Sequence, residues 1–161
     1  MGRVEVVDAQ RSDRVWIEQL LETHWGSTRM VSRGRLHEVP DLPALIARFE
    51  GEPVGLLSYH IDGEDGEIAL LNSLRSGLGI GTALLEAALT RLRALDCRRA
   101  WLITTNDNLS AMNFYHARGW TLAALHRDAV ARSRALKPEI SLLGQGGIMI
   151  CDELEFERIL I

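Results

Sequence analysis

The middle of the chain reads Arg75-Ser76-Gly77-Leu78-Gly79-Ile80-Gly81-Thr82 and continues into the apolar run Ala83-Leu84-Leu85-Glu86-Ala87-Ala88-Leu89. Three glycines at alternate positions allow backbone conformations with positive φ and a close approach to a ligand. An apolar, strand-like run at residues 68–71 precedes them, so the pattern predicts the order strand, glycine loop, helix. Because the first N–H groups of a helix lack intrahelical partners and favour an anion, this stretch predicts a phosphate-binding loop.

The spacing of these glycines excludes two common nucleotide-binding motifs. A dinucleotide-binding fingerprint needs G-x-G-x-x-G and a P-loop needs G-K-[ST], whereas residues 77–82 read G-x-G-x-G-T. A loop that joins a strand to a helix also uses glycine for steric reasons alone. The glycine loop by itself therefore leaves ligand binding open.

A second motif occupies residues 108–120 and reads Asn108-Leu109-Ser110-Ala111-Met112-Asn113-Phe114-Tyr115-His116-Ala117-Arg118-Gly119-Trp120. Asn108 is suited to cap the N-terminus of a helix, and Gly119 is suited to end it. Ala111, Phe114 and Tyr115 fall at i, i+3 and i+4, which places them on one side of that helix. The motif therefore predicts a short helix with one apolar and aromatic side.

Together the two motifs resemble those of the GNAT acetyltransferase superfamily, in which an R/Q-x-x-G-x-G/A loop binds acyl-CoA and an N-x-x-A-x-x-F/L-Y-x-x-x-G-F segment follows. Gly79 and Gly81 match the glycines of the first motif, while Ser76 stands at its Arg/Gln position and Arg75 comes one residue earlier. The second motif, with Trp120 in place of its last aromatic residue, is matched by Asn108, Ala111, Phe114, Tyr115 and Gly119.

The resemblance covers most of residues 44–126 and implies an α/β fold. Its centre is a mixed β-sheet of about six to seven strands, flanked by helices and splayed to hold acetyl-CoA. The strand at 100–105 follows a helix, so it is expected to run parallel to the strand before the glycine loop. Apolar runs of strand length occur at residues 3–7, 45–49, 54–61, 67–71, 100–105, 120–126 and 153–160.

Helical periods fill the spaces between several of these strands, at residues 13–25, 80–95, 108–118 and 128–137. The long helix is predicted to have one apolar face made by Ile80, Leu84, Ala88, Leu92 and Leu95. Residues 27–38 lack a period and are predicted to form a loop with a short extended piece. We expect residues 1–161 to form a single N-acetyltransferase domain.

Composition restricts the class of protein. A chain of 161 residues with 47% hydrophobic and 25% charged residues is typical of a soluble globular domain. A net charge of −4 argues against nucleic acid as the main partner, and no apolar run approaches the roughly 18–20 residues of a membrane helix. We therefore expect a cytoplasmic protein. Cys97 and Cys151 lack the spacing of metal ligands, so no metal site is expected.

The resemblance implies that acetyl-CoA is the co-substrate. In this family main-chain N–H groups hold the pyrophosphate, which corresponds here to residues 78–82, and the preceding strand supplies main-chain hydrogen bonds to the pantetheine. The residues expected to contact the co-substrate are Leu71, Asn72, Gly77, Leu78, Gly79, Ile80, Gly81, Thr82, Asn108 and Tyr115.

Two residues are candidates for acid–base chemistry. The resemblance places Tyr115 near the CoA sulfur, and a phenol with a pKa near ~10 stays protonated at neutral pH and can donate to a thiolate. Glu67 begins the central strand with the same alternation as Ala69 and Leu71, and it is a candidate general base. The alternatives are a reaction without a dedicated base, or a base among His37, Glu38 and His60.

The implied function is acetyl transfer from acetyl-CoA to a primary amine, directly within a ternary complex. The acceptor is left open among a small amine, an amino acid, an antibiotic and a protein amino group. Residues 24–43 and 127–150 are expected to close over the cleft, and a homodimer is one expectation because dimers are common in the family. The acidic face of the last strand suits a cationic acceptor, or is simply solvated. A CoA-binding sensor or scaffold without turnover is the alternative function.

Overall fold

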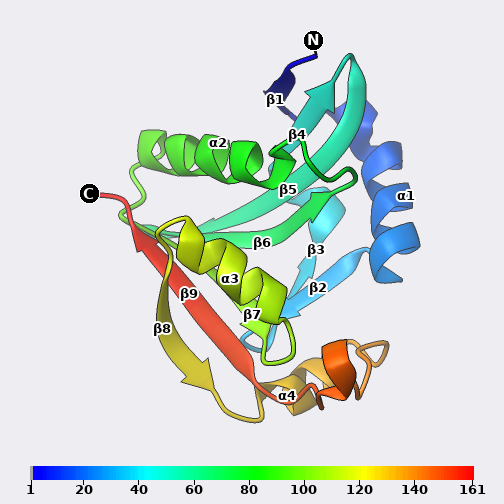
Figure 1. The fold of residues 1–161 in the computed structure, drawn as a ribbon, viewed down its shortest axis with the longest axis vertical. Coiled ribbons are helices and arrows are strands. Elements are labelled where there is room, and N and C mark those ends of the chain that lie inside the picture. The colour runs from blue at the N-terminus through cyan, green and yellow to red at the C-terminus, as the bar shows by residue number, and fades with distance from the viewer. Residues whose placement is uncertain (1) are drawn as a thin grey trace.

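The computed structural model describes residues 2–161, which contain a seven-stranded mixed sheet, a two-stranded sheet and four α-helices (Figure 1). Neighbouring strands of the large sheet are antiparallel except for one parallel pair, Asp65–Ser73 with Arg99–Thr105. The prediction of a mixed sheet with a parallel pair around the glycine loop is confirmed. The strand order is β1 (Val4–Asp8), β4 (Ala44–Phe49), β5 (Glu52–Asp62), β6 (Asp65–Ser73), β7 (Arg99–Thr105), β9 (Glu153–Ile159) and β8 (Thr121–His126).

Helices cover both faces of this sheet. The buried side chains of α1 (Arg14–Trp25) pack in a cluster with Ile46 and Leu56, whereas those of α2 (Ile80–Ala94) pack with Leu57 and Leu102 from the opposite face. The helix α3 (Leu109–Ala117) joins the α2 cluster, and α4 (Ala129–Leu136) lies near the start of β9 (Figure 1). None of the helices in the described part of the chain has the length and apolarity of a transmembrane span.

The long helix α2 is positioned by its apolar face. Four of the five residues predicted for that face are buried, but Leu95 is 48% exposed because α2 ends at Ala94 and Leu95 is its C-cap. A small residue under the helix permits its close approach to β6: a Cβ added at Gly66 would lie 2.6 Å from a methyl group of Leu92. At the other end of the helix, a Cβ added at Gly55 in β5 would lie 2.5 Å from a methyl group of Ile80, so close packing also positions the N-terminus of α2 against the sheet.

The strands β6 and β7 separate soon after they begin. Their parallel pairing runs from Asp65 opposite Arg99 to Glu67 opposite Trp101, and it stops there although β6 continues to Ser73 and β7 to Thr105. Beyond this point the main-chain groups of β6 and β7 are therefore not paired with each other. This divergence is the splay that the resemblance implied.

A β-bulge lies next to the divergence. Opposite β5, Ile68 pairs with Tyr59 and Leu70 pairs with Ser58, so Ala69 is an extra residue in β6. A bulge bends the strand and reverses the side on which later residues fall. The prediction that Glu67 and Leu71 share one face of the sheet is therefore wrong. Glu67 lies on the face covered by α1, where it contacts His37, whereas Leu71 packs on the opposite face in the cluster formed with α2.

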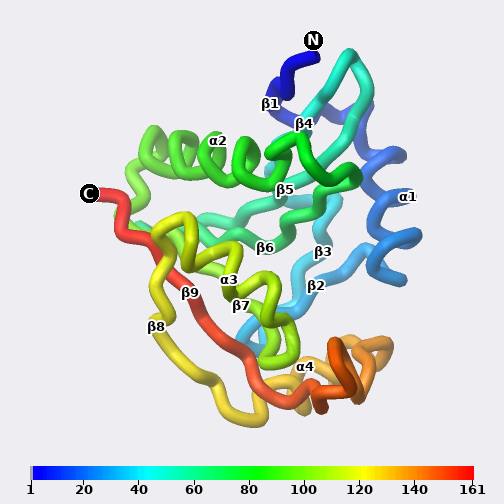
Figure 2. The backbone as a smooth tube through the Cα atoms, in the orientation of Figure 1, coloured from blue at the N-terminus to red at the C-terminus, as the bar shows by residue number. Residues whose placement is uncertain are grey.

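Residues 29–38 form a β-hairpin where a loop was predicted. The strands β2 (Arg29–Ser32) and β3 (Arg35–Glu38) are joined by Arg33 and Gly34, which both have positive φ, 50° and 74°. Such a two-residue turn matches the twist of a hairpin, although arginine is unusual in it. The traces in Figures 1 and 2 place the hairpin beside β6, and β2 also packs against α4.

The acidic strand β9 attaches this hairpin to the sheet. β9 lies between β7 and β8 rather than at the edge, and its carboxylates Glu153 and Glu155 are only 2% and 5% exposed. The N–H of Arg33 donates to Glu153 Oε1 at 2.9 Å, and the Arg33 guanidinium lies 3.4 Å from Glu155. For these two glutamates, the interpretation of the acidic face as solvated is wrong.

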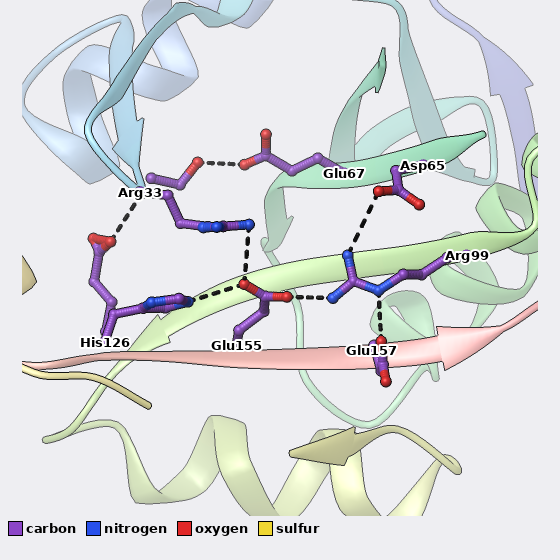
Figure 3. A network of polar contacts seen from close by, with 9 residues as sticks. Arg33, Asp65, Glu67, Arg99, His126, Glu155 and Glu157 are labelled. Atoms are coloured by element: carbon purple, nitrogen blue, oxygen red, sulfur yellow. Dashed lines mark hydrogen bonds and ion pairs between the residues drawn. The ribbon is translucent and has the colours of Figure 1, made fainter. Parts of the chain in front are cut away.

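Glu155 is the centre of the network in Figure 3. Its carboxylate contacts Arg99 and lies 3.0 Å from His126 Nε2, while Arg99 also binds Glu157 at 2.5 Å. Burial alone would raise the pKa of Glu155, but the contacts with His126, Arg99 and Arg33 outweigh it and hold the pKa below its usual value. Strands β7, β8 and β9 and the hairpin are thus joined through one carboxylate.

We predict that Glu155→Gln lowers the free energy of unfolding by about 3 kcal/mol at pH 7, because its basic partners lose a buried counter-charge. Because the pKa of Glu155 is lowered in the folded protein, the stabilisation by its negative charge is fully present above the ordinary carboxyl pKa of about 4.3. This stabilisation is lost as the pH falls through the pKa of Glu155 in the folded state. Urea unfolding at pH 7 and at pH 3.5 measures both effects. Glu157→Gln, at a side chain 29% exposed, is the control and loses less; equal losses contradict the prediction.

Candidate active site

The divergence of β6 and β7 opens a cavity of about 440 Å³. Its walls come from both strands, from the hairpin strand β2, from α3 and from the segment around α4. Residues of both segments that were expected to close over the cleft, 24–43 and 127–150, line it, among them Trp25, Met30, Ser32, Ser133, Lys137 and Glu139. The cavity is thus enclosed by parts of the chain far apart in sequence.

Glu67 lies at the inner end of this cavity and is only 2% exposed. Ser32 Oγ donates to one of its carboxylate oxygens, and His37 Nε2 lies 2.9 Å from the other. Each oxygen keeps capacity for a further hydrogen bond, since a carboxylate has about four acceptor sites. The hairpin therefore fixes the orientation of Glu67 without using up its capacity to accept a proton.

The other proposed bases separate into two groups. His37 and His60 lie near Glu67, with their ring centroids 5.1 Å apart, and burial together with the nearby Arg35 and His37 lowers the pKa of His60. Glu38 lies apart, with a half-exposed side chain that contacts Thr28 at 3.3 Å and Arg29 at 3.8 Å. The structure thus brings His37 and His60 to Glu67 and leaves Glu38 apart from it, and none of these three residues lines the cavity.

Tyr115 lines the same cavity from α3. Its ring packs between aromatic neighbours, with centroid distances of 5.3 Å to Phe114, 5.9 Å to Trp120 and 6.1 Å to Phe156. Burial raises the pKa of Tyr115 to about 12. The phenol is therefore a hydrogen-bond and proton donor throughout the neutral pH range.

The glycine loop forms a second, more open hollow of about 910 Å³. Gly77 and Gly79 have positive φ of 80° and 69°, and Gly79 is the N-cap of α2. The first intrahelical bond is donated by Ala83 N to Gly79 O at 3.0 Å, so the N–H groups of residues 80–82 have no partner within the helix. The loop presents these groups at the positive end of the helix dipole.

The predicted co-substrate contacts fall around the two hollows. Leu71, Asn108 and Ala111 line both, so the cavity and the glycine hollow form one continuous cleft. Asn108 Oδ1 caps α3 by accepting from Ala111 N at 3.2 Å. Leu78 does not line the cleft because its side chain packs against the main core. The glycine hollow is lined by Asn72, Gly77, Gly79, Ile80, Gly81 and Thr82.

Among the cleft residues that were not predicted from the sequence, two carry a positive charge, Arg118 and Lys137. Arg118 lines the glycine hollow, where its Nε donates to Thr82 Oγ1 at 2.8 Å and its guanidinium stacks on Phe114 at 3.6 Å. Lys137 lines the inner cavity. Arg118 comes just before Gly119, at the end of the second motif, and this position is the sequence signal that could have identified it. Lys137 has no comparable signal, since only the helix-ending Pro138 stands beside it.

Comparisons with known proteins agree with this architecture. The sequence profile of the acetyltransferase (GNAT) family matches residues 10–120. The uncharacterised protein YdhI of Bacillus subtilis (strain 168) is 41% identical over 138 residues, 85% of this chain and 86% of YdhI. A second uncharacterised protein of that organism, YxbD, is 38% identical over 139 residues, 86% of this chain and 87% of YxbD.

Solved structures share the fold at low identity. The crystal structure of a GNAT family acetyltransferase from Elizabethkingia anophelis with acetyl-CoA bound superposes with a TM-score of 0.71 and 13% identity, over 98% of this chain and 99% of that one. This likeness concerns the fold alone. The family profile, which matches more than half of the chain, decides the assignment: the chain belongs to the acetyltransferase (GNAT) family.

Proposed function

We propose that the protein is an N-acetyltransferase that transfers an acetyl group from acetyl-CoA directly to a primary amine within a ternary complex. The observation that carries this proposal is the continuous cleft, with unpaired helix N–H groups at one end and Glu67 and Tyr115 at the other. Acetyl-CoA has a matching arrangement of chemical groups, since its pyrophosphate and its thioester lie far apart along one extended molecule.

In this proposal the glycine loop binds the pyrophosphate. The N–H groups of residues 80–82 and the dipole of α2 favour an anion at that point, and Arg118 adds a guanidinium beside Thr82. The pantetheine extends along β6 at Leu71 and Asn72, where the strand has no β7 partner. Asn108 and Tyr115 contact the co-substrate from α3.

The chemistry follows from the groups at the inner end. Glu67 accepts a proton from the ammonium group of the acceptor, and the neutral nitrogen then attacks the carbonyl carbon of the thioester. As the amide C–N bond forms, the C–S bond breaks and the Tyr115 hydroxyl donates a proton to the departing sulfur. The second proton lost by the nitrogen restores the phenol, so the net products are the amide, the free thiol and one released proton.

Thiol release tests the function as a whole. Purified protein is incubated with acetyl-CoA and a panel of primary amines, and the free thiol is measured with a thiol-specific reagent. We expect amine-dependent release with formation of the acetylated amine. A protein that binds acetyl-CoA but releases no thiol with any amine would instead be a sensor or scaffold.

We predict that Gly79→Ala weakens acetyl-CoA binding by roughly tenfold, measured by isothermal titration calorimetry. A left-handed conformation costs a non-glycine residue about 1–2 kcal/mol. In the Gly79→Ala variant the loop is expected to relieve this strain by a shift of its backbone, which moves the N–H groups away from the pyrophosphate. Gly63→Ala is the matched control, because Gly63 has a similar φ of 62°, has no atom within 4 Å of an added Cβ, and lies in the β5–β6 turn. Equal effects of both variants on affinity would contradict the role of the loop.

We predict that Tyr115→Phe lowers kcat by about 10²–10⁴-fold, the usual contribution of a general acid, while acetyl-CoA still binds. The other tyrosine of the chain, Tyr59, is buried in the core away from the cleft, and Tyr59→Phe serves as the control with unchanged kcat. Steady-state thiol release gives kcat, and calorimetry gives the affinity. Full turnover by Tyr115→Phe excludes the general-acid role.

We predict that Glu67→Gln lowers kcat/KM most strongly near neutral pH. At higher pH the amine loses its proton without help, so the deficit relative to wild type shrinks as the pH approaches the pKa of the amine. A pH profile of kcat/KM from pH 6.5 to 9.5 measures this, with Glu38→Gln as the control at the carboxylate outside the cavity. A deficit that does not change with pH would assign Glu67 a structural role.

A further inference from the structure

Lys137 is an unusual component of the cavity wall. It follows α4 as its C-cap, ahead of Pro138, and it is only 7% exposed. Its main-chain N–H donates to Ser133 O at 2.8 Å, which ties the residue to the end of the helix. The side chain thus belongs to an ordered wall of the cavity rather than to a solvated surface.

The Lys137 ammonium has no oxygen partner among residues 2–161. Its one polar contact there is with the thioether of Met30, at 3.8 Å, and no carboxylate of the described chain lies within 4.0 Å. Burial lowers the pKa of Lys137, with opposing smaller effects from Glu139 and Arg29. A buried ammonium without a counter-charge or an acceptor is costly, so the position lacks a structural explanation.

The carboxylates that line the same cavity are differently placed. Glu67 is bound by Ser32 and His37, and Glu153 accepts from Arg33 N at 2.9 Å and from Ser133 Oγ at 3.1 Å. Glu139 is exposed at the rim. Within residues 2–161, Lys137 is therefore the buried charged group of the cavity that has no oxygen acceptor, and two of its three N–H donors remain for a ligand beside the weak contact with Met30.

We propose that Lys137 binds an anionic group, such as a carboxylate, on the acceptor amine, so that the preferred acceptors are amino acids or related aminated anions. This inference rests on the proposed function, because it places the amine of the same molecule at Glu67 within one cavity. An incoming carboxylate supplies the missing counter-charge and accepts charge-assisted hydrogen bonds from a buried ammonium. The cavity thereby favours an anion-bearing acceptor over the same amine without the anion.

The test uses matched acceptors that differ only in the acid group. Suitable pairs are 4-aminobutanoate with propylamine, L-leucine with 3-methylbutylamine, and L-ornithine with putrescine; 3-aminopropylphosphonate replaces the carboxylate by a phosphonate. The proteins are wild type, Lys137→Met and Lys137→Arg. For each, kcat/KM is measured by thiol release and acetyl-CoA affinity by calorimetry.

We expect wild type to prefer the acid of at least one pair by roughly tenfold or more, in line with hydrogen bonds to charged groups. Lys137→Met should remove this preference by lowering kcat/KM for the acid far more than for the amine without it, and Lys137→Arg should retain part of the preference. Three results overturn the proposal: equal or better use of the neutral amines by wild type, a preference that survives in Lys137→Met, or an equal loss for both members of every pair.

A binding measurement separates this proposal from the proposed function. Thermal unfolding of the CoA complex is followed with each acid and with its neutral partner. If no amine gives thiol release, the proposed function fails, but stabilisation by an acid in wild type and not in Lys137→Met still supports the anion site. Absence of stabilisation by every acid in wild type overturns the anion site even if neutral amines are acetylated.

Discussion

The end of β-pairing between β6 and β7 at Glu67 and Trp101 is the constraint on which the site depends. Before this point the two strands are held in a continuous sheet, and beyond it their main chains are free to meet a ligand. The extra residue Ala69 bends β6 at the same place and turns Glu67 toward the hairpin side. Because α2 is packed closely on β5 and β6, the glycine loop stays fixed at the outer end of the opening.

A gap between strands becomes an enclosed site only because other segments cover it. The hairpin β2–β3 supplies Ser32 and His37 to Glu67, and its turn is held to β9 through Glu153 and Glu155. The acidic strand thus has a structural role that a solvated face would not have. Buried polar groups of this kind stabilise a structure only when they are satisfied, which makes Lys137, without an oxygen partner in residues 2–161, distinct within the same wall.

Sequence reasoning predicted the parts of the molecule whose signals are local. The glycine spacing, the apolar period of α2 and the motif around Tyr115 each depend on neighbours within a few residues, so the order strand, loop, helix, strand, helix followed from them. The bulge at Ala69 has no local signal, because an alanine fits a regular strand equally well. The hairpin at residues 29–38 lacks a strong turn dipeptide, since Arg33 adopts a conformation that arginine seldom takes. The residues that contact Glu67, which are Ser32 and His37, and Thr82, which contacts Arg118, come from distant segments, and only the fold brings them together.

A crystal structure of the protein with acetyl-CoA tests the central claim most directly, that the divergence of β6 and β7 is the co-substrate site. We expect the pyrophosphate to bind the N–H groups of residues 80–82 and the pantetheine to lie along β6 at Leu71 and Asn72. We also expect the thioester sulfur within hydrogen-bond reach of the Tyr115 hydroxyl, at about 3–3.5 Å. Acetyl-CoA bound outside the cleft, or a sulfur pointing away from both Tyr115 and Glu67, would contradict it.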